Sequence, residues 1–66
     1  MRIILNGEEI IFDREINISN LLERYSLDKR KIAVERNLEI VPQSNFEEVI
    51  LNEGDRIEII HFIGGG

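Results

Sequence analysis

The dipeptide Asn6-Gly7 stands between two apolar stretches, residues 1–5 and 8–12. In a two-residue type I′ turn both central residues need a positive φ angle, and asparagine followed by glycine is the pair that tolerates this best. Such a pair between apolar runs is a strong short-range signal for two antiparallel strands. The chain is therefore predicted to open with a β-hairpin.

A short amphipathic helix is predicted after the hairpin. One face of this segment carries apolar residues at spacings of three and four: Ile18, Leu21, Leu22 and Tyr25. Asn17 is a favourable N-cap, because its side-chain oxygen can accept a hydrogen bond from the first helical turn. Ile16 can pack on Leu21 as a hydrophobic staple, and the helix is expected to end near Ser26.

Three strand segments are predicted in the remainder of the chain, over residues 32–36, 39–41 and 56–63. Asn37-Leu38 is expected to form the turn between the first two strands. Pro42 ends the second strand, because proline cannot donate to a strand ladder. Residues 44–47 have the spacing of a capping box, which predicts one helical turn with Phe46 reaching the core.

The order of these elements is hairpin, helix, two short strands and a final strand. A sheet with a single helix across one face buries the apolar faces economically, which makes the fold class α+β. We expect a mixed sheet of four to five strands, with the final strand in the middle, beside the first strand and parallel to it. The 66 residues are expected to form one domain over residues 1–63 and a flexible glycine tail over 64–66.

Composition narrows the classes of function. Thirteen acidic against eight basic residues give a net charge of −5, which argues against a nucleic-acid surface; the basic run 29–31 is expected to be a solvated loop. The chain has no cysteine, no stretch resembling a signal peptide and no membrane-spanning apolar run, so we expect a cytoplasmic protein. A chain of this size is too small for both a core and a deep catalytic cleft. We therefore expect neither an enzyme nor a metal site.

The chain ends in Gly64-Gly65-Gly66, where no tight turn explains three glycines. A frayed end or an incidental extension is the ordinary alternative. Because it has no side chains, such a tail can enter a narrow channel in another protein over about 10 Å. The chemistry would then belong to the carboxylate of Gly66, and the folded body would serve as its handle.

The strand that leads into the tail alternates between two faces, one with Ile57 and Ile59 and the other with Glu58, Ile60 and Phe62. Exposed apolar side chains beside a free end suggest a docking surface, so Ile60, Phe62 and Ile63 are the candidate partner interface. The alternative is that the strand bulges, or that a loop covers its edge, and that Ile60 and Phe62 belong to the core. His61 has inward parity and is expected to be a structural histidine rather than a catalytic or metal-binding one.

The whole chain resembles the sulfur-carrier family of thiamine biosynthesis (the ThiS family), which has the ubiquitin-like β-grasp fold. The resemblance rests on residues 5–7, 21–23 and 40–42, on the aromatic Phe46, and most heavily on 52–60 running into 62–66. Gln43, where a basic residue is expected in many members, and the segment 35–37 depart from the pattern. Neither departure touches the tail, so both bear on partner detail and not on activity.

The resemblance implies a cycle of sulfur transfer. An E1-like adenylyltransferase would bind the folded body and adenylate Gly66 with ATP. A persulfide donor supplied by a cysteine desulfurase would replace AMP and leave a C-terminal thiocarboxylate, and thiazole synthase would accept that sulfur. Gly64 and Gly65 would form the tail, the chain would bind no cofactor of its own, and we expect a monomer when it is free.

Three other functions stay open on the sequence alone. A carrier of the same architecture serves molybdopterin synthesis and also ends in two glycines. A ubiquitin-like modifier that is joined to lysines begins with the same tail chemistry. A non-covalent binding module could carry the glycine tail incidentally, because a fold does not settle a function.

Overall fold

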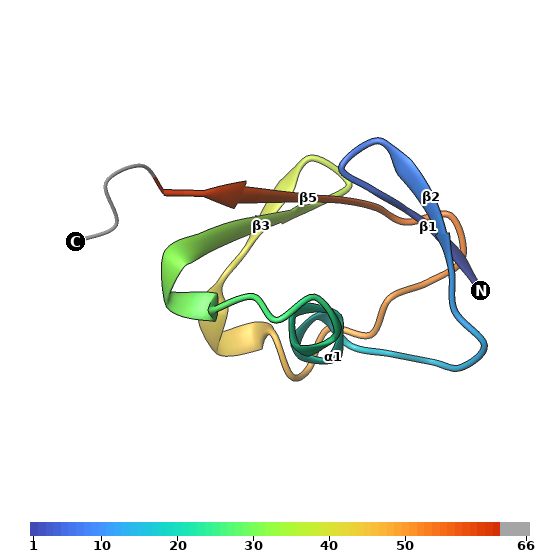
Figure 1. Ribbon diagram of the computed structural model, residues 1–66, viewed down its shortest axis with the longest axis horizontal. Helices are drawn as coiled ribbons and strands as arrows, with labels where there is room; N and C mark the ends of the chain where they lie inside the picture. Colours follow the sequence, from blue (N-terminus) through green and yellow to red (C-terminus); the bar gives the residue numbers. More distant parts are fainter. Residues whose placement is uncertain (63–66) are drawn as a thin grey trace.

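The computed structural model describes residues 1–62 (Figure 1). The strands are β1 (Arg2–Leu5), β2 (Glu8–Ile11), β3 (Ile32–Arg36), β4 (Glu39–Val41) and β5 (Arg56–His61). The α-helix is α1 (Ile18–Arg24), and two 3₁₀ turns are η1 (Lys29–Lys31) and η2 (Gln43–Asn45).

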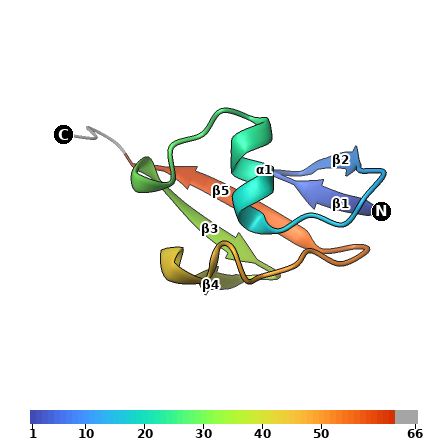
Figure 2. The same ribbon diagram turned by 90° about the horizontal axis from the view of Figure 1, so that it is seen from below.

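The five strands form one mixed sheet in the order β2-β1-β5-β3-β4. β1 and β5 are parallel, and the other neighbouring strands are antiparallel. α1 crosses one face of this sheet, and no element of the described chain covers the other (Figures 1 and 2). The α+β class and the central, parallel position of the last strand are therefore confirmed. Neither α1 nor any other helix formed by residues 1–62 combines the length and hydropathy needed to cross a bilayer.

The opening hairpin turns at Asn6 and Gly7, whose φ angles of 48° and 84° are the positive values predicted for this turn. Asn6 also ties the hairpin to the central strand. Its backbone N–H donates to the carbonyl of Ile57 at 2.9 Å, and its Oδ1 accepts from the backbone N–H of Ile59 at 2.8 Å. The turn that pairs β1 with β2 thus also fixes β1 against β5.

The turn between β3 and β4 repeats this arrangement on the other side of β5. Asn37 and Leu38 have φ angles of 51° and 72°, so the predicted turn is confirmed with a leucine in the left-handed region. The backbone N–H of Asn37 donates to the carbonyl of Arg56 at 2.8 Å, and its Oδ1 accepts from the N–H of Arg56 at 2.9 Å. Two turn asparagines therefore hold β5 from opposite sides.

The helix begins at the predicted N-cap. Asn17 Oδ1 accepts from the backbone N–H of Asn20 at 2.7 Å, and Asn20 Oδ1 accepts from the N–H of Asn17 at 3.2 Å, which closes a reciprocal capping box. The predicted apolar positions in the first turns are buried: Ile18, Leu21 and Leu22. Tyr25 is the C-cap and faces the same side of the sheet, beside Leu5 and Ile59, but it is 40% exposed and does not belong to the buried core. The helix ends at Arg24, before that position is reached.

The predicted helical turn after β4 exists, but its capping box does not. The turn is η2, which starts after Pro42 without a side-chain cap, so Ser44 lies inside it and cannot be its N-cap. The N–H of Asn45 donates to the carbonyl of Pro42 at 2.9 Å, so the turn starts two residues earlier than the sequence spacing indicated. Phe46 is 3% exposed, and its predicted role in the core is confirmed.

The core lies between α1 and the sheet. Its buried apolar residues are Ile3, Phe12, Ile16, Ile18, Leu21, Leu22, Ile32, Val34, Phe46, Leu51, Ile57 and Ile59. Leu51 and Phe46 come from the long connection between β4 and β5, which closes the end of the core that α1 leaves open. This packing explains how so short a chain can form a core without disulfides.

Among residues 1–62, Asp55 is the one polar or charged residue that is buried, with 7% of its surface exposed. Burial by itself raises the pKa of its carboxyl. The backbone N–H of Asn52 (2.8 Å), Asn37 Nδ2 (3.0 Å) and Arg36 Nε (2.9 Å) donate to the carboxylate, and together they leave the pKa below its ordinary value. This ionised side chain joins the β3–β4 turn to the start of β5.

The basic run 29–31 is exposed, as predicted, but it forms η1 rather than an irregular loop. Asp28 is its N-cap and accepts from the backbone N–H of Arg30 at 2.9 Å. The Arg30 side chain also donates to both carboxylate oxygens, at 3.1 and 3.0 Å. This side-chain pairing, helped by the backbone bond, lowers the pKa of Asp28 to about 2.

Candidate docking face at the end of β5

The last strand separates its side chains as the sequence alternation predicted. Ile57 and Ile59 are buried beneath α1, whereas Ile60 and Phe62 are 46% and 54% exposed on the uncovered face. The pairing of β5 with β3 runs without interruption from Arg36–Ile57 to Ile32–His61, so the alternative of a bulged strand is wrong. The outward orientation of Ile60 and Phe62 is confirmed. Their contact with a partner stays a prediction.

β5 is held to its neighbour up to the last described residue. Beyond the paired strand, the backbone N–H of Phe62 donates to the carbonyl of Lys31 at 3.1 Å. The predicted interface residue Ile63 and the predicted tail of Gly64, Gly65 and the reactive Gly66 lie outside the described residues. The tail is therefore attached to a strand whose final described position is fixed by the sheet.

The uncovered face of the sheet carries further apolar side chains that the sequence reading missed. Ile40 on β4 is 63% exposed and Ile11 on β2 is 61% exposed. Both lie on edge strands of three or four residues, which are too short for alternation to reveal which side is covered. The register places Ile40 opposite Glu35, and Glu35 opposite Glu58 of β5. Two carboxylates thus lie side by side among exposed apolar groups.

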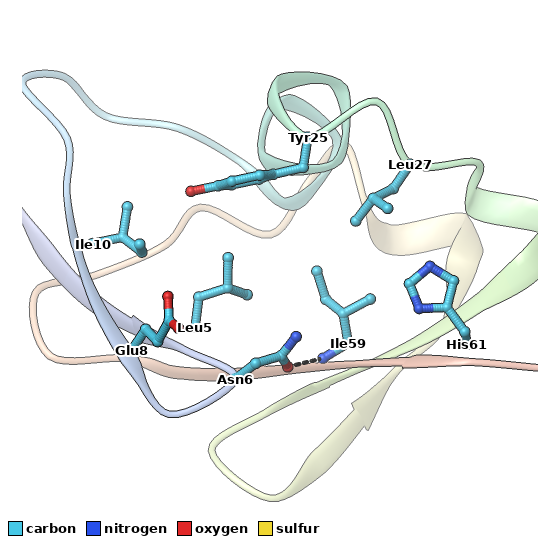
Figure 3. Close-up of a pocket in the computed structure, with 8 residues that line it drawn as sticks. All are labelled: Leu5, Asn6, Glu8, Ile10, Tyr25, Leu27, Ile59 and His61. Carbon is cyan, nitrogen blue, oxygen red and sulfur yellow. Dashed lines mark hydrogen bonds between the residues drawn. The ribbon is translucent and has the colours of Figure 1, made fainter.

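A shallow groove of about 410 Å³ lies on the other side of β5, between the C-terminal end of α1 and the opening hairpin (Figure 3). Tyr25 and Leu27 form its helix side, and Ile59 and His61 come from β5. His61 is on this side, as its parity predicted, and it is exposed. Within residues 1–62 no hydrogen bond joins its ring to another side chain, and its structural role stays a prediction.

The polar side chains that line the groove are Asn6, Glu8, Tyr25 and His61. Asn6 lines the groove, but its amide oxygen is already used by the N–H of Ile59. Across residues 1–62 no group of three His, Asp or Glu side chains is placed to hold a metal ion. The described residues at the end of β5 present apolar and acidic side chains next to Phe62, where the tail begins.

Comparison with known proteins gives consistent matches over the whole chain. The family model described as the ThiS family matches residues 2–66. The sulfur carrier protein ThiS of Bacillus subtilis is 41% identical over 63 residues, which cover 94% of this chain and 96% of that protein. A thiazole synthase of Paramagnetospirillum magneticum is 50% identical over 66 residues, which are all of this chain but 20% of that protein. The chain thus spans one fifth of this longer relative.

The fold also matches a solved structure. The crystal structure of the thiamine biosynthesis protein ThiS from Geobacter metallireducens superposes with a TM-score of 0.85 at 28% sequence identity, and the match covers all of both chains. Both the fold and the sequence match therefore extend over the whole chain, and the sequence match includes the terminal glycines. The ubiquitin-like β-grasp fold expected from the resemblance is confirmed, and the chain belongs to the ThiS family.

Proposed function

We propose that this chain is the sulfur carrier of thiamine biosynthesis and that the carboxylate of Gly66 is the group that carries the sulfur. The main support is the family match over residues 2–66, which includes every residue of the tail. The relative from Bacillus subtilis of nearly equal length bears the name of sulfur carrier protein. The chain acts as a co-substrate of other enzymes rather than as an enzyme.

The chemistry begins with activation, because oxide is a very poor leaving group on a carboxylate. In the active site of an E1-like adenylyltransferase, an oxygen of Gly66 attacks the α-phosphorus of ATP and pyrophosphate leaves. The terminal sulfur of a persulfide donor then attacks the acyl carbon and AMP leaves. A thiol reduces the resulting sulfur–sulfur bond, which releases the thiocarboxylate.

The sequence of the tail suits this transfer. Residues 64–66 carry no side chains and can extend about 10 Å, so a narrow channel can close around their backbone. β5 anchors the tail in the middle of the sheet, with neighbours on both sides. The sheet therefore holds Phe62, the last described residue before the tail, through the backbone bond to Lys31.

Thiazole synthase is the proposed acceptor of the sulfur. The relative from Paramagnetospirillum magneticum bears that name and contains a segment 50% identical to this chain. A carrier-like segment inside a protein named for the acceptor supports a functional connection between the two. The adenylating enzyme and the persulfide donor are proposed from the resemblance to the family; the chemistry of the tail requires only that the carboxylate be activated before a sulfur nucleophile attacks it.

Intact-mass spectrometry tests the proposal directly. The purified chain is incubated with ATP, the adenylating enzyme and a sulfur source. We expect a mass gain of roughly 16 Da, as sulfur replaces one oxygen at the terminus. A variant that lacks Gly65 and Gly66 should show no gain at all. Its melting temperature should stay unchanged, because the buried core described above is formed by residues between Ile3 and Ile59. Gly65→Ala should lose part of the activity.

The same material separates the alternatives. Loaded carrier is mixed with thiazole synthase and, separately, with a molybdopterin-forming synthase. Sulfur transfer to the second enzyme alone would overturn the assignment to thiamine synthesis. Conjugates of high molecular weight that resist reducing agents would indicate a protein modifier. Full activity of the truncated variant would indicate a binding module whose tail is incidental.

A further inference from the structure

The opening turn brings together two groups that can react with each other. Of the six asparagines in the chain, Asn6 is the one that a glycine follows. Glycine has no Cβ to shield its backbone nitrogen, so the nitrogen of Gly7 can approach the side-chain carbonyl carbon of Asn6. Both residues are exposed, and a Cβ at Gly7 would meet no atom within 4 Å. Water therefore has access to the turn.

We propose that Asn6 is a site of spontaneous deamidation and that its contact with β5 controls the rate. The Gly7 nitrogen loses its proton and forms a bond to Cγ of Asn6, while the side-chain nitrogen gains a proton and leaves as ammonia. The product is a five-membered succinimide ring. Water then opens the ring at either carbonyl carbon, which leaves aspartate or isoaspartate in place of Asn6. The net reaction is the hydrolysis of one amide by one water molecule.

The folded turn keeps the two reacting groups apart. Asn6 and Gly7 have φ angles of 48° and 84°, the pattern of a type I′ turn. In that turn the ψ angle of the first residue is about 30°. Closing the ring instead brings Cβ of Asn6 into one plane with the Gly7 nitrogen, which requires the ψ of a type II′ turn, about −120°. The peptide between the two residues must therefore rotate before the ring can form.

Hydrogen bonds to the central strand hold Asn6 in the unreactive arrangement. Its backbone N–H donates to the carbonyl of Ile57 at 2.9 Å. Its Oδ1 accepts from the N–H of Ile59 at 2.8 Å, which directs the side chain toward β5 (Figure 3). The carbon that is attacked cannot move to the Gly7 nitrogen until Oδ1 leaves Ile59. Deamidation in the folded protein should therefore follow the local opening of this turn from β5.

Asn37 gives a matched comparison within the same molecule. Its φ angle is 51°, and it holds β5 in the same way through the backbone of Arg56. It differs in two respects. The next residue is Leu38, whose side chain hinders attack by the backbone nitrogen, and its Nδ2, the group that would leave, donates to Asp55 at 3.0 Å. Within residues 1–62 no such bond holds the Nδ2 of Asn6.

The two products should affect the fold differently. Aspartate keeps an oxygen that can accept from the N–H of Ile59. Isoaspartate passes the backbone through the former side chain and adds one atom to a two-residue turn. The pairing of Leu5 with Glu8 and the bonds from the turn to β5 then no longer fit together. Isoaspartate should therefore weaken the hold of β1 on the strand that precedes the tail.

Peptide mapping of the full chain by mass spectrometry tests the proposal. The chain is incubated in mildly alkaline buffer, with and without guanidinium chloride, and the tryptic peptide of residues 3–14 is followed. Deamidation adds about 1 Da, because a hydroxyl replaces the amide nitrogen. In the denatured sample Asn6 should react faster than every other asparagine. In the native sample we expect it to react at least about tenfold more slowly than in the denatured one.

The variant Leu38→Gly is the control for the sequence effect. It creates a second asparagine–glycine pair at a position whose φ angle of 72° glycine adopts without strain. In denaturant Asn37 of this variant should react at a rate within about twofold of Asn6. In the native variant Asn37 should be the slower of the two, because both its Oδ1 and its Nδ2 are held.

Two results would overturn separate parts of the proposal. If Asn6 of the denatured chain reacts no faster than Asn37, it is not a preferred deamidation site and the whole proposal fails. If native and denatured chains lose the Asn6 amide at the same rate, the contact with β5 does not control the reaction. Neither result bears on sulfur transfer by Gly66, which the mass measurement at the terminus tests independently.

Discussion

The two faces of β5 differ in what their side chains contribute. On the face covered by α1, Ile57 is fully buried and Ile59 is 8% exposed. On the other face, Glu58 is exposed, and Ile60 keeps almost half of its surface in water. Both faces belong to the same central strand and both carry isoleucine, but only the uncovered face of β5 also carries the charged side chains Arg56 and Glu58.

This difference shows which part of the strand maintains the fold and which part is available to partners. Burying an isoleucine side chain contributes about 2 kcal/mol or more to folding. An isoleucine left exposed beside a pair of carboxylates contributes far less. A short chain with a thin margin of stability nevertheless keeps several such residues on its uncovered face. Two predictions compare the two faces, and a third tests the buried carboxylate that precedes β5; the largest expected effect comes first.

Ile57→Ala should lower the free energy of unfolding by about 3 kcal/mol, because it leaves a cavity in the middle of the core. Denaturant unfolding followed by circular dichroism measures this loss. Ile60→Ala, on the same strand but the uncovered face, is the matched control and should lower it by less than about 1 kcal/mol. Equal losses for the two variants would contradict the division between the faces.

Phe62→Ala should weaken binding to the adenylating enzyme by about 2 kcal/mol, as expected for an exposed aromatic side chain that becomes buried in an interface. Its melting temperature should stay close to that of the wild type. Titration calorimetry with the purified enzyme, beside a thermal melt, gives both numbers. A large loss of stability with unchanged affinity would place Phe62 in the core.

Asp55→Asn should lower the free energy of unfolding at pH 7 by about 1.5 kcal/mol, since it removes a charged acceptor of three hydrogen bonds. The pKa of Asp55 is lowered in the fold, so its stabilising effect is complete above the unfolded pKa of roughly 3.9. The effect is lost as the pH falls through the folded pKa.

The difference in stability between the wild type and Asp55→Asn should therefore be largest near neutrality and should shrink below about pH 4. Unfolding curves collected from pH 7 down to the acid limit measure this trend. A difference that stays constant over the whole range would show that the carboxylate charge is not what stabilises this turn.

Most of the fold could be predicted because local signals agreed with one another. The Asn6-Gly7 pair fixed the hairpin, Asn17 fixed the start of the helix, and the alternation in residues 56–62 fixed which side chains face outward. Each of these signals depends on neighbours in the sequence. The structure confirms the hairpin, the helix start and the outward side chains, because the tertiary contacts agree with these local preferences.

The parts that could not be predicted depend on contacts between distant segments. The pairing of Glu35 with Glu58 requires the register of β3 against β5, which no local pattern specifies. The donors to Asp55 come from the β3–β4 turn and from the loop before β5. The partial exposure of Tyr25 could not be predicted, because spacing alone does not show that the helix ends at Arg24.

The central position of β5 also has a mechanical consequence. An enzyme that draws the tail into a channel pulls β5 along its own axis. The hydrogen bonds between β5 and β3 run perpendicular to that axis, and those between β5 and β1 are slanted to it. Tension along β5 therefore shears both sets of hydrogen bonds at once, and the load is divided among them. If the tail instead left from an edge strand, tension could peel that strand from the sheet, and its hydrogen bonds would break one at a time. The carrier can thus withstand a firm grip on its terminus without unravelling the strand that bears it.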